Sequence, residues 1–318
     1  MTAAKYRQSL PQMGETLMLT DGGIETTLIF HEGLDLPLFA SFTLLETTEG
    51  RRALRSYYER YARVAREQNT GFILDSATWR ASADWGDRLG YGAAALAEAN
   101  RSAIELLFEL RAEFESDKPF VISGNIGPRG DGYAPETIMG AGEAAEYHAA
   151  QVAVFDAAGA DMVSAITMTH AGEAAGIARA CAARGIPLAL SFTVETDGRL
   201  PSGQSLREAV REVDADPSGG PSYYMINCAH PDHFRAIIEP GADWTGRIRG
   251  LRANASRLSH AELDEAEVLD EGNPAELAQD YAGLLELLPN LRVFGGCCGT
   301  DHRHIRAIGE ACVPMPVA

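Results

Sequence analysis

Eight short apolar segments alternate with longer helical patterns along nearly the whole chain, and this alternation constrains the fold more than any other feature of the sequence. The predicted strands cover residues 17–20, 72–75, 120–123, 162–166, 187–192, 222–227, 249–254 and 292–294. The predicted helices cover residues 47–68, 93–115, 141–158, 171–184, 205–212 and 274–288, and two more begin at residues 231 and 301. Strands that alternate with helices in this way are typical of a parallel sheet built from βα units.

Eight such units predict an α/β fold of the (β/α)8 TIM-barrel type, with residues 1–318 forming a single domain. A doubly wound sheet is the alternative, but it gives no reason for the last strand to end on a turn rich in glycine and cysteine. In a TIM barrel the active site lies at the carboxyl ends of the strands. The polar residues and cysteines that follow the predicted strands are Asp21, Asp75, Asn125, Thr167, Glu195, Cys228, Asn254, Cys297 and Cys298. We therefore expect the functional site at this end of the barrel.

The last predicted strand runs into a Gly-Gly-Cys-Cys-Gly turn at residues 295–299. Neighbouring side chains of a regular strand point to opposite faces, but glycines allow the chain to leave the pleat, so Cys297 and Cys298 can both reach one ion. Cys228 ends the sixth predicted strand and would supply a third ligand. Three protein ligands leave one zinc position open, as in catalytic sites. Small buried side chains or a redox pair are the alternative interpretations of these cysteines.

The composition is that of a soluble globular protein, with 46% hydrophobic and 23% charged residues. Five cysteines without regular pairing argue against a secreted disulfide framework and favour the cytoplasm. No apolar stretch is long enough for a membrane span, and the N-terminus lacks the apolar segment of a signal peptide. The net charge of −18 disfavours nucleic acid as a partner. It is compatible with a cationic small molecule, but a solvated acidic surface is by far the more common reason for such a charge.

Several of these segments together resemble the homocysteine S-methyltransferase family, the zinc-dependent barrel enzymes that move a methyl group from a sulfonium or quaternary ammonium donor to a thiol. The resemblance extends over nearly the whole chain. The segments that carry it are Asp21-Gly22-Gly23, residues 78–82, Gly-Asn-Ile-Gly-Pro at residues 124–128, Asn227-Cys228 and the Gly-Gly-Cys-Cys-Gly turn. The two cysteine segments are the most specific of these, whereas an Asp-Gly-Gly turn alone is common.

The resemblance implies a cofactor, a ligand set and a substrate site. The implied Zn²⁺ ligands, which are also the catalytic residues, are Cys228, Cys297 and Cys298. The implied contacts to the amino acid acceptor are Asp21, Gly22 and Thr167. Because zinc deprotonates a bound thiol, the acceptor sulfur would be nucleophilic in a negatively charged site that suits a cationic donor.

One departure from the family pattern concerns the acceptor. The glutamate that usually follows the fourth strand, and that binds the amino group of the acceptor, is replaced by Ile166. Glu173 and Glu195 are the nearest carboxylates along the chain that could take its place. If neither does, Asp21 is the remaining candidate to face the ammonium group.

Two further departures concern the donor. The usual Thr-Asn-Thr-Tyr segment reads Ser-Ala-Thr-Trp at residues 76–79, and Phe39 stands where a tryptophan is common. Aromatic faces attract cations, so Phe39, Trp79 and Trp85 are candidates to hold the methyl donor. Packing in the core or in a loop is the alternative role for each of them.

The remaining cysteines and histidines receive structural interpretations. Cys181 lies within a helical pattern and Cys312 lies near the C-terminus, so both are expected to be structural. His302 and His304 are expected to lie at a helix start or on the surface, because a metal-binding His-x-His pair of the amidohydrolase type would follow the first strand.

The sequence thus predicts zinc-dependent methyl transfer from a cationic donor to a thiol, with homocysteine as acceptor and methionine as product. The alternatives are a related enzyme that acts on another thiol, a zinc hydrolase, or a zinc-binding scaffold without catalysis. Three thiolate ligands argue against the hydrolase, because their electron donation weakens zinc as a Lewis acid toward water. The oligomeric state and the identity of the donor are not indicated.

Overall fold

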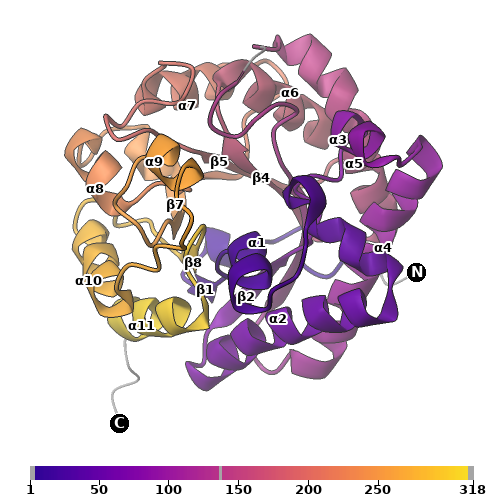
Figure 1. Cartoon of the computed structure of the whole chain (residues 1–318). Helices are drawn as coiled ribbons and strands as arrows, with labels where there is room; N and C mark the ends of the chain where they lie inside the picture. The colour runs from indigo at the N-terminus through magenta and orange to yellow at the C-terminus, as the bar shows by residue number, and fades with distance from the viewer. Residues whose placement is uncertain (1–3, 136–137, 314–318) are drawn as a thin grey trace.

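A computed structural model describes residues 4–135 and 138–313 and shows eight parallel strands closed into a barrel (Figure 1). The strands are β1 (Met18–Leu19), β2 (Gly71–Asp75), β3 (Phe120–Ile126), β4 (Met162–Met168), β5 (Leu188–Phe192), β6 (Tyr223–Asn227), β7 (Ile248–Ala253) and β8 (Val293–Gly296). Each strand pairs with the next, and β8 closes the barrel against β1, where Met18 lies opposite both Gly71 and Val293. The predicted TIM barrel is therefore confirmed.

Most of the helices surround the barrel on its outer side (Figure 1). The α-helices are α1 (Ile24–Thr26), α2 (Thr48–Glu67), α3 (Ala83–Leu89), α4 (Ala93–Phe114), α5 (Ala141–Ala158), α6 (Ala171–Ala182), α7 (Leu206–Asp214), α8 (Pro231–Phe234), α9 (His260–Asp264), α10 (Pro274–Leu285) and α11 (His302–Cys312). Short segments of 3-10 helix or, for η2, π-helix are η1 (Pro11–Met13), η2 (Thr27–His31), η3 (Pro37–Phe39), η4 (Ser41–Glu46), η5 (Arg235–Ile237) and η6 (Thr245–Arg247). Within the described ranges, no helix combines the length and apolar character that a membrane crossing requires.

The outer helices pack on the sheet through apolar stripes at helical spacing. In α2 the buried residues Leu54, Tyr57, Tyr58 and Tyr61 recur every three or four positions and face the barrel. The barrel interior holds a second apolar cluster, which includes Met18, Ile73, Val121, Met162, Ile166, Tyr223 and Val293. This layout leaves the polar strand ends on one side of a packed interior.

Three short elements around the site were not predicted. The helices α1, α3 and α9 all lie in segments that follow strands β1, β2 and β7, and α1 and α9 lie in front of the barrel in Figure 1. The polar, acidic stretch at residues 256–272 lies between the predicted seventh strand and the predicted helix at residues 274–288. It contains α9 because Ser259 and Glu262 form a capping box, a signal that is readable as Ser-x-x-Glu.

A second difference lies in β4, which runs two residues beyond its predicted end at residue 166. The pairing of β4 with β5 shifts register between Ala165 and Met168, and Thr167 has a left-handed φ of 67°. This bulge turns the backbone N–H of Thr167 toward Asn227 Oδ1, which accepts a hydrogen bond at 3.0 Å. The local backbone therefore aims Thr167 into the end of the barrel.

Helix α11 begins directly after the cysteine turn, and Asp301 fixes its start. The Asp301 carboxylate accepts a hydrogen bond from Arg303 N at 2.9 Å, and His304 Nδ1 lies 3.1 Å from Asp301 Oδ1. His304 Nε2 lies 2.8 Å from the carbonyl oxygen of Glu271. His304 is therefore a fully buried residue of the helix start and is not a surface residue.

Replacing the Asp301 cap should destabilise the protein in a pH-dependent way. Burial raises the pKa of Asp301, but hydrogen bonds from His304 and Arg303 outweigh it and hold the pKa below the ordinary value. The carboxylate thus stabilises the folded state above its unfolded-state pKa, and this contribution is lost as the pH falls toward the folded-state pKa. We expect Asp301→Ala to lower the free energy of unfolding by about 1 kcal/mol at neutral pH. Urea unfolding monitored at several pH values measures this.

The matched control is Thr47→Ala, because Thr47 caps α2 through an uncharged hydroxyl that accepts from Gly50 N. The loss in free energy of unfolding caused by Thr47→Ala should not change as Asp301 becomes protonated. An Asp301→Ala effect that stays constant between neutral pH and about pH 3 would contradict the proposed electrostatic role.

Candidate functional site

The three predicted cysteine ligands meet at the carboxyl ends of β6 and β8. Any two of the Sγ atoms of Cys228, Cys297 and Cys298 lie within 4.8 Å of each other. This cluster satisfies the requirement that donors to one tetrahedral ion converge on a single point. The residues present therefore fit a metal centre.

Unusual backbone conformations bring the three sulfurs together. Cys228 has a left-handed φ of 51°, which turns it out of the strand direction of β6. Gly296 lies so close to Thr300 that a Cβ at this position would be 2.0 Å from Thr300 Oγ1. Gly299 has a φ of 77°, a conformation that favours glycine. The glycines around the cysteine pair are therefore required by the turn itself.

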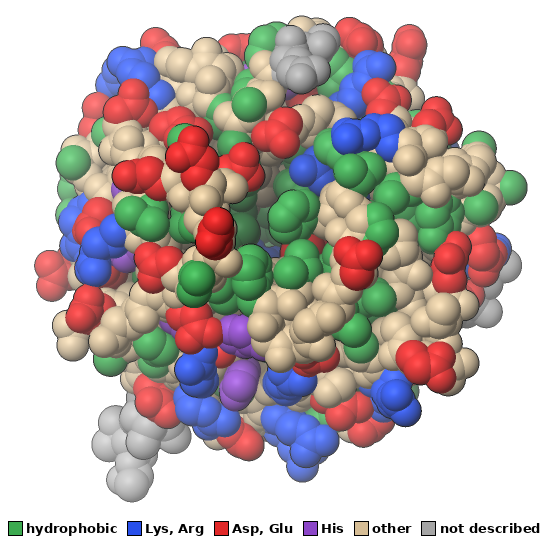
Figure 2. Space-filling view, in the orientation of Figure 1, with side chains coloured by type: hydrophobic (Ala, Val, Ile, Leu, Met, Phe, Trp, Pro, Cys, Tyr) green, Lys and Arg blue, Asp and Glu red, His purple; other side chains and the backbone are tan. Residues whose placement is uncertain are grey.

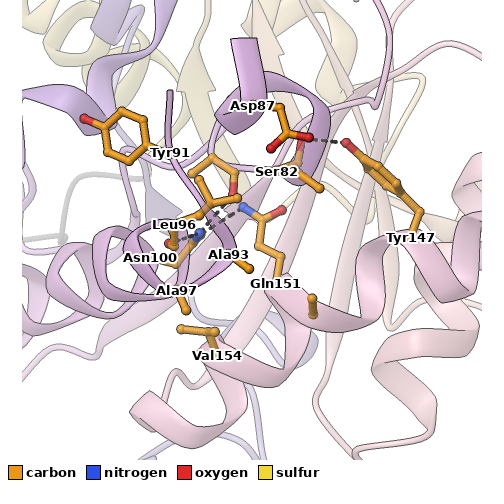
Figure 3. Close-up of a pocket in the computed structure, with 13 residues that line it drawn as sticks. Ser82, Asp87, Tyr91, Ala93, Leu96, Ala97, Asn100, Tyr147, Gln151 and Val154 are labelled. Carbon is orange, nitrogen blue, oxygen red and sulfur yellow. Dashed lines mark hydrogen bonds between the residues drawn. The ribbon is translucent and has the colours of Figure 1, made fainter. Parts of the chain in front are cut away.

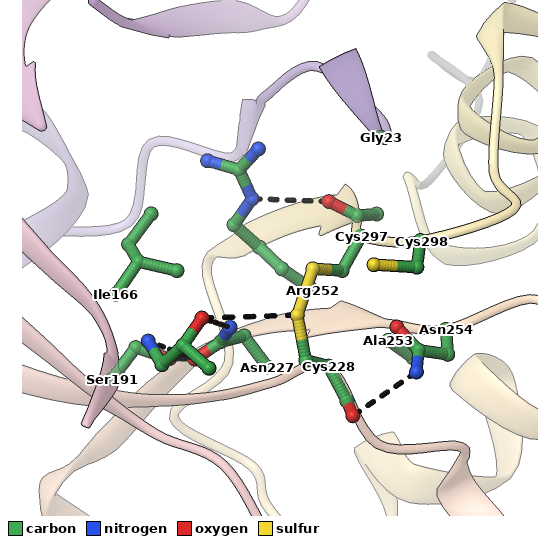
Figure 4. Close-up of a disulfide and its surroundings, with 12 residues drawn as sticks. Gly23, Ile166, Ser191, Asn227, Cys228, Arg252, Ala253, Asn254, Cys297 and Cys298 are labelled. Carbon is green, nitrogen blue, oxygen red and sulfur yellow. Dashed lines mark hydrogen bonds between the residues drawn. A yellow bond between two sulfur atoms is a disulfide. The ribbon is translucent and has the colours of Figure 1, made fainter. Parts of the chain in front are cut away.

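In this structure Cys228 and Cys297 are joined by a disulfide, with their Cα atoms 5.3 Å apart, and Cys298 keeps a free thiol (Figure 4). The disulfide does not join the adjacent cysteines, Cys297 and Cys298. It joins two residues that are 69 positions apart in the sequence. A disulfide removes two of the three thiolates. A metal bound by all three cysteines therefore requires the reduced form of this pair.

A buried ion-pair group lies beside the cysteines. Arg252 of β7 donates hydrogen bonds to Asp21 Oδ1 and to Asp75 Oδ2, both at 2.5 Å. Its Nε donates to the carbonyl oxygen of Gly296, directly before the cysteine pair, at 3.1 Å. Two carboxylates share one guanidinium, so the group carries a net negative charge. Burial raises the pKa of Asp21 to about 6, which Arg252 opposes and the charge of Asp75 reinforces.

The other two predicted substrate contacts lie on either side of this group. Thr167 Oγ1 lies 3.8 Å from Cys228 Sγ and accepts a hydrogen bond from Asn227 Nδ2 at 2.8 Å, which leaves its own hydrogen free for the sulfur. Gly22 is buried, and its carbonyl oxygen lies 3.0 Å from the hydroxyl of Tyr57. The same hydroxyl lies 3.0 Å from Asp21 Oδ2. The structure thus places Asp21, Gly22 and Thr167 around the cysteine cluster.

The two carboxylates that could replace the usual glutamate at Ile166 each pair with a histidine. Glu173 accepts from Arg129 N at 2.7 Å and pairs with His148 Nε2 at 2.9 Å, inside the helical layer. Glu195 lies 2.9 Å from His260 Nδ1. Ile166 itself belongs to the apolar cluster of the barrel interior. Glu173 is thus held within the helical layer, whereas Glu195 pairs with His260, whose Nε2 lies 2.5 Å from the carbonyl oxygen of Cys228.

Several residues around the cluster were not identified from the sequence. His260 Nε2 lies 2.5 Å from the carbonyl oxygen of Cys228. Tyr133 stacks on His260 with ring centroids 4.0 Å apart, and its hydroxyl lies 3.7 Å from Cys298 Sγ. Burial raises the pKa values of Tyr133 and Cys298. Tyr133 lies in an irregular segment and His260 begins the short helix α9, so strand and helix periodicity gives no signal for either residue.

Glu25 is a further carboxylate of this region. It lies on α1, and residues on both sides of it contact the cysteine turn. A Cβ on Gly23 would be 2.6 Å from the carbonyl oxygen of Cys297. Thr26 Oγ1 accepts a hydrogen bond from Gly299 N at 3.2 Å. Ser41 Oγ donates to Glu25 Oε1 at 3.0 Å. Burial raises the pKa of Glu25 to about 7.

The three aromatic residues considered for the donor differ in their surroundings. Phe39 is 52% exposed, whereas Trp85 is buried. The guanidinium carbons of Arg80 and Arg88 lie 3.6 and 4.4 Å from the centroid of the Trp85 ring, so side chains of the protein already use this ring as a cation partner. Trp79 also contacts Arg80. The protein itself therefore supplies the cations at both tryptophans.

The surface at this end of the barrel is hollowed near its middle, with acidic and apolar side chains around the hollow (Figure 2). A separate cavity of about 280 Å³ lies between α3, α4 and α5 and includes Tyr91, Asn100, Tyr147 and Gln151 in its lining (Figure 3). None of the three clustered cysteines lines this cavity. The cysteine cluster remains the site with the clearest chemistry.

Comparison with known proteins defines the class of this barrel. The model of the homocysteine S-methyltransferase family matches residues 18–312. Homocysteine S-methyltransferase 3 from Arabidopsis thaliana is 25% identical over 215 residues, which cover 64% of this chain and 60% of the relative. The chain belongs to the homocysteine S-methyltransferase family.

Solved structures agree with the fold. The homocysteine methyltransferase MmuM from Escherichia coli superposes in its oxidised form with a TM-score of 0.74 at 20% identity, covering 95% of this chain and 98% of MmuM. Its metallated form gives a TM-score of 0.70 at 20% identity, covering 93% of this chain and 96% of MmuM. These similarities describe the barrel architecture.

Proposed function

We propose that this protein transfers a methyl group from a sulfonium or quaternary ammonium donor to a thiol, with zinc as cofactor and homocysteine as the acceptor that becomes methionine. The convergence of Cys228, Cys297 and Cys298, with their sulfurs within 4.8 Å of one another, is the observation that carries this proposal. Family membership supports it. A reducing compartment such as the cytoplasm would keep the three thiolates available.

In the reduced protein, Cys228, Cys297 and Cys298 would hold the ion. Zinc, when bound, lowers the pKa of a thiol so that the acceptor sulfur is a thiolate at neutral pH. The acceptor sulfur then forms a bond to the methyl carbon as the bond from that carbon to the donor breaks. The electron pair of the broken bond stays on the donor sulfur or nitrogen, which becomes neutral.

The protein contributes charge and position to this reaction. Arg252, Asp21 and Asp75 together leave a negative charge close to the cysteines, which favours a cationic donor. Thr167 and Tyr133 place hydroxyl groups within 4 Å of two cysteine sulfurs, Thr167 at 3.8 Å and Tyr133 at 3.7 Å. We propose that Asp21, Gly22 and Thr167 contact the acceptor. No general base is needed, because the attacking sulfur carries no proton.

The activity test uses the reduced, zinc-loaded protein with homocysteine and either glycine betaine or S-methylmethionine. We expect loss of free thiol and formation of methionine with at least one donor. Non-reactive sulfonium or quaternary ammonium compounds should inhibit, and mononucleotides should not. Inhibition by nucleotides alone would show that the donor belongs to another chemical class.

The metal prediction concerns the three cysteines. The reduced protein should bind about one zinc ion per chain, and Cys228→Ala, Cys297→Ala and Cys298→Ala should each remove the ion or abolish activity. Cys181→Ala is the matched control, because Cys181 is buried in α6 outside the cluster. Metal analysis of the purified variants measures this. Full zinc content and full activity in any one cluster variant would exclude that residue as a ligand.

The acceptor prediction concerns Asp21. Burying the ammonium group of homocysteine without an anionic partner is costly, and Asp21 belongs to a group with excess negative charge. We expect Asp21→Asn to weaken homocysteine binding about tenfold or more while zinc stays bound. Binding of an analogue without the amino group should change little. Equal homocysteine affinity in both proteins, measured by calorimetry, would place the ammonium group against another carboxylate.

A further inference from the structure

Arg80 is a buried arginine with an unusual lack of partners. It follows β2, is 7% exposed, and its guanidinium carbon lies 4.1 Å from the Trp79 ring centroid and 3.6 Å from that of Trp85. Two aromatic rings therefore fix the position of the guanidinium group. Such stacking leaves the N–H groups, which lie in the guanidinium plane, available for hydrogen bonds.

Few of these donors are used. A guanidinium group has five N–H donors. Arg80 Nη1 donates to the carbonyl oxygen of Gly130 at 3.2 Å, and Arg80 Nε is buried without a hydrogen-bond partner among the described residues. Burial lowers the pKa of Arg80 to about 10, although the charges of Asp131 and Glu25 oppose this shift. The side chain is thus a buried cation whose hydrogen-bonding capacity is largely unused within residues 4–135 and 138–313.

The other buried arginines provide a comparison. Arg111 forms an ion pair with Asp161 at 2.7 Å, and Arg252 forms ion pairs with two carboxylates at 2.5 Å. Within the described parts of the chain, Arg80 forms no ion pair with a carboxylate. Buried charges in proteins are normally paired. An anion other than the carboxylates of residues 4–135 and 138–313 would complete this site.

Arg80 also lies next to the proposed reaction centre. Gly130, which accepts the hydrogen bond from Arg80, lies three residues before Tyr133, whose hydroxyl lies 3.7 Å from Cys298 Sγ. A Cβ on Gly132 would lie 3.2 Å from Thr167 Cγ2 and 3.4 Å from Trp79 Cζ2. Arg80 and Trp79 therefore lie beside the loop at residues 130–133, which adjoins Thr167 and contains Tyr133, the two residues that contact the cysteine sulfurs.

We propose that Arg80 is a specificity-determining residue that binds the carboxylate of a substrate. This inference rests on the proposed function. The planar guanidinium fork matches a carboxylate with two parallel hydrogen bonds. An amino acid thiol and a zwitterionic methyl donor both carry such a group, so the experiment must assign the carboxylate to one of them.

The experiment measures dissociation constants by calorimetry on the reduced, zinc-loaded protein and its Arg80→Gln and Arg80→Lys variants. The acceptor arm compares homocysteine with aminopropanethiol, which lacks only the carboxylate. The donor arm compares glycine betaine with tetramethylammonium, which differs in the same way. Arg88→Gln is the matched control, because Arg88 stacks on the same Trp85 ring but is exposed.

We expect Arg80→Gln to weaken one carboxylate-bearing ligand by about 10- to 100-fold and to leave its analogue without the carboxylate unchanged. The arm in which this occurs identifies the source of the carboxylate. Arg80→Lys should show a smaller loss, because it keeps the charge and loses the planar fork. Arg88→Gln should have no effect.

Two results would overturn the inference. One is a wild-type protein that binds each ligand and its analogue without the carboxylate equally well. The other is an Arg80→Gln variant that weakens both members of a pair alike. The wild-type comparison does not depend on whether the variants fold. Failure of the wild-type protein to bind zinc or any thiol would instead contradict the proposed function.

Discussion

The buried ion-pair group of Arg252 with Asp21 and Asp75 is the interaction on which the site depends. It joins the carboxyl ends of β1, β2 and β7, and through Arg252 Nε and the carbonyl oxygen of Gly296 it also holds the end of β8. Removing one partner of a buried ion pair typically costs about 3–5 kcal/mol, because the remaining charge has no partner. The same contacts that close the barrel at this end therefore also fix the start of the cysteine turn.

The Gly-Gly-Cys-Cys-Gly turn at the end of β8 places the cysteine sulfurs where they can bind a metal ion. Gly296 and Gly299 allow the chain to bend where side chains would collide or strain, and Cys228 adopts a left-handed conformation to bring its sulfur to the same place. Asn227 supports this arrangement by hydrogen bonds to Thr167, across the barrel end. The outcome is a cluster of sulfurs in an anionic setting, which suits a soft metal ion and a cationic donor.

The sequence predicted the features that follow from periodicity and chain direction. Parallel strands place their carboxyl ends at one rim, so the meeting of Cys228 with the cysteine pair could be predicted from two strand ends alone. The fold was predicted for the same reason.

The specific side-chain pairings between residues far apart in the sequence could not be predicted. The pairing of Arg252 with two carboxylates, the stack of Tyr133 on His260 and the disulfide between Cys228 and Cys297 all join segments far apart in the sequence. Their partners are chosen by tertiary geometry, which neither strand alternation nor helical spacing encodes.

X-ray absorption at the zinc edge tests the central claim most directly, because it counts the sulfur atoms bound to the metal. The reduced, zinc-loaded protein should show three sulfur ligands and one lighter ligand. Addition of homocysteine should replace the lighter ligand with a fourth sulfur. A spectrum that does not change with homocysteine, or fewer than three sulfurs in the free protein, would contradict the account.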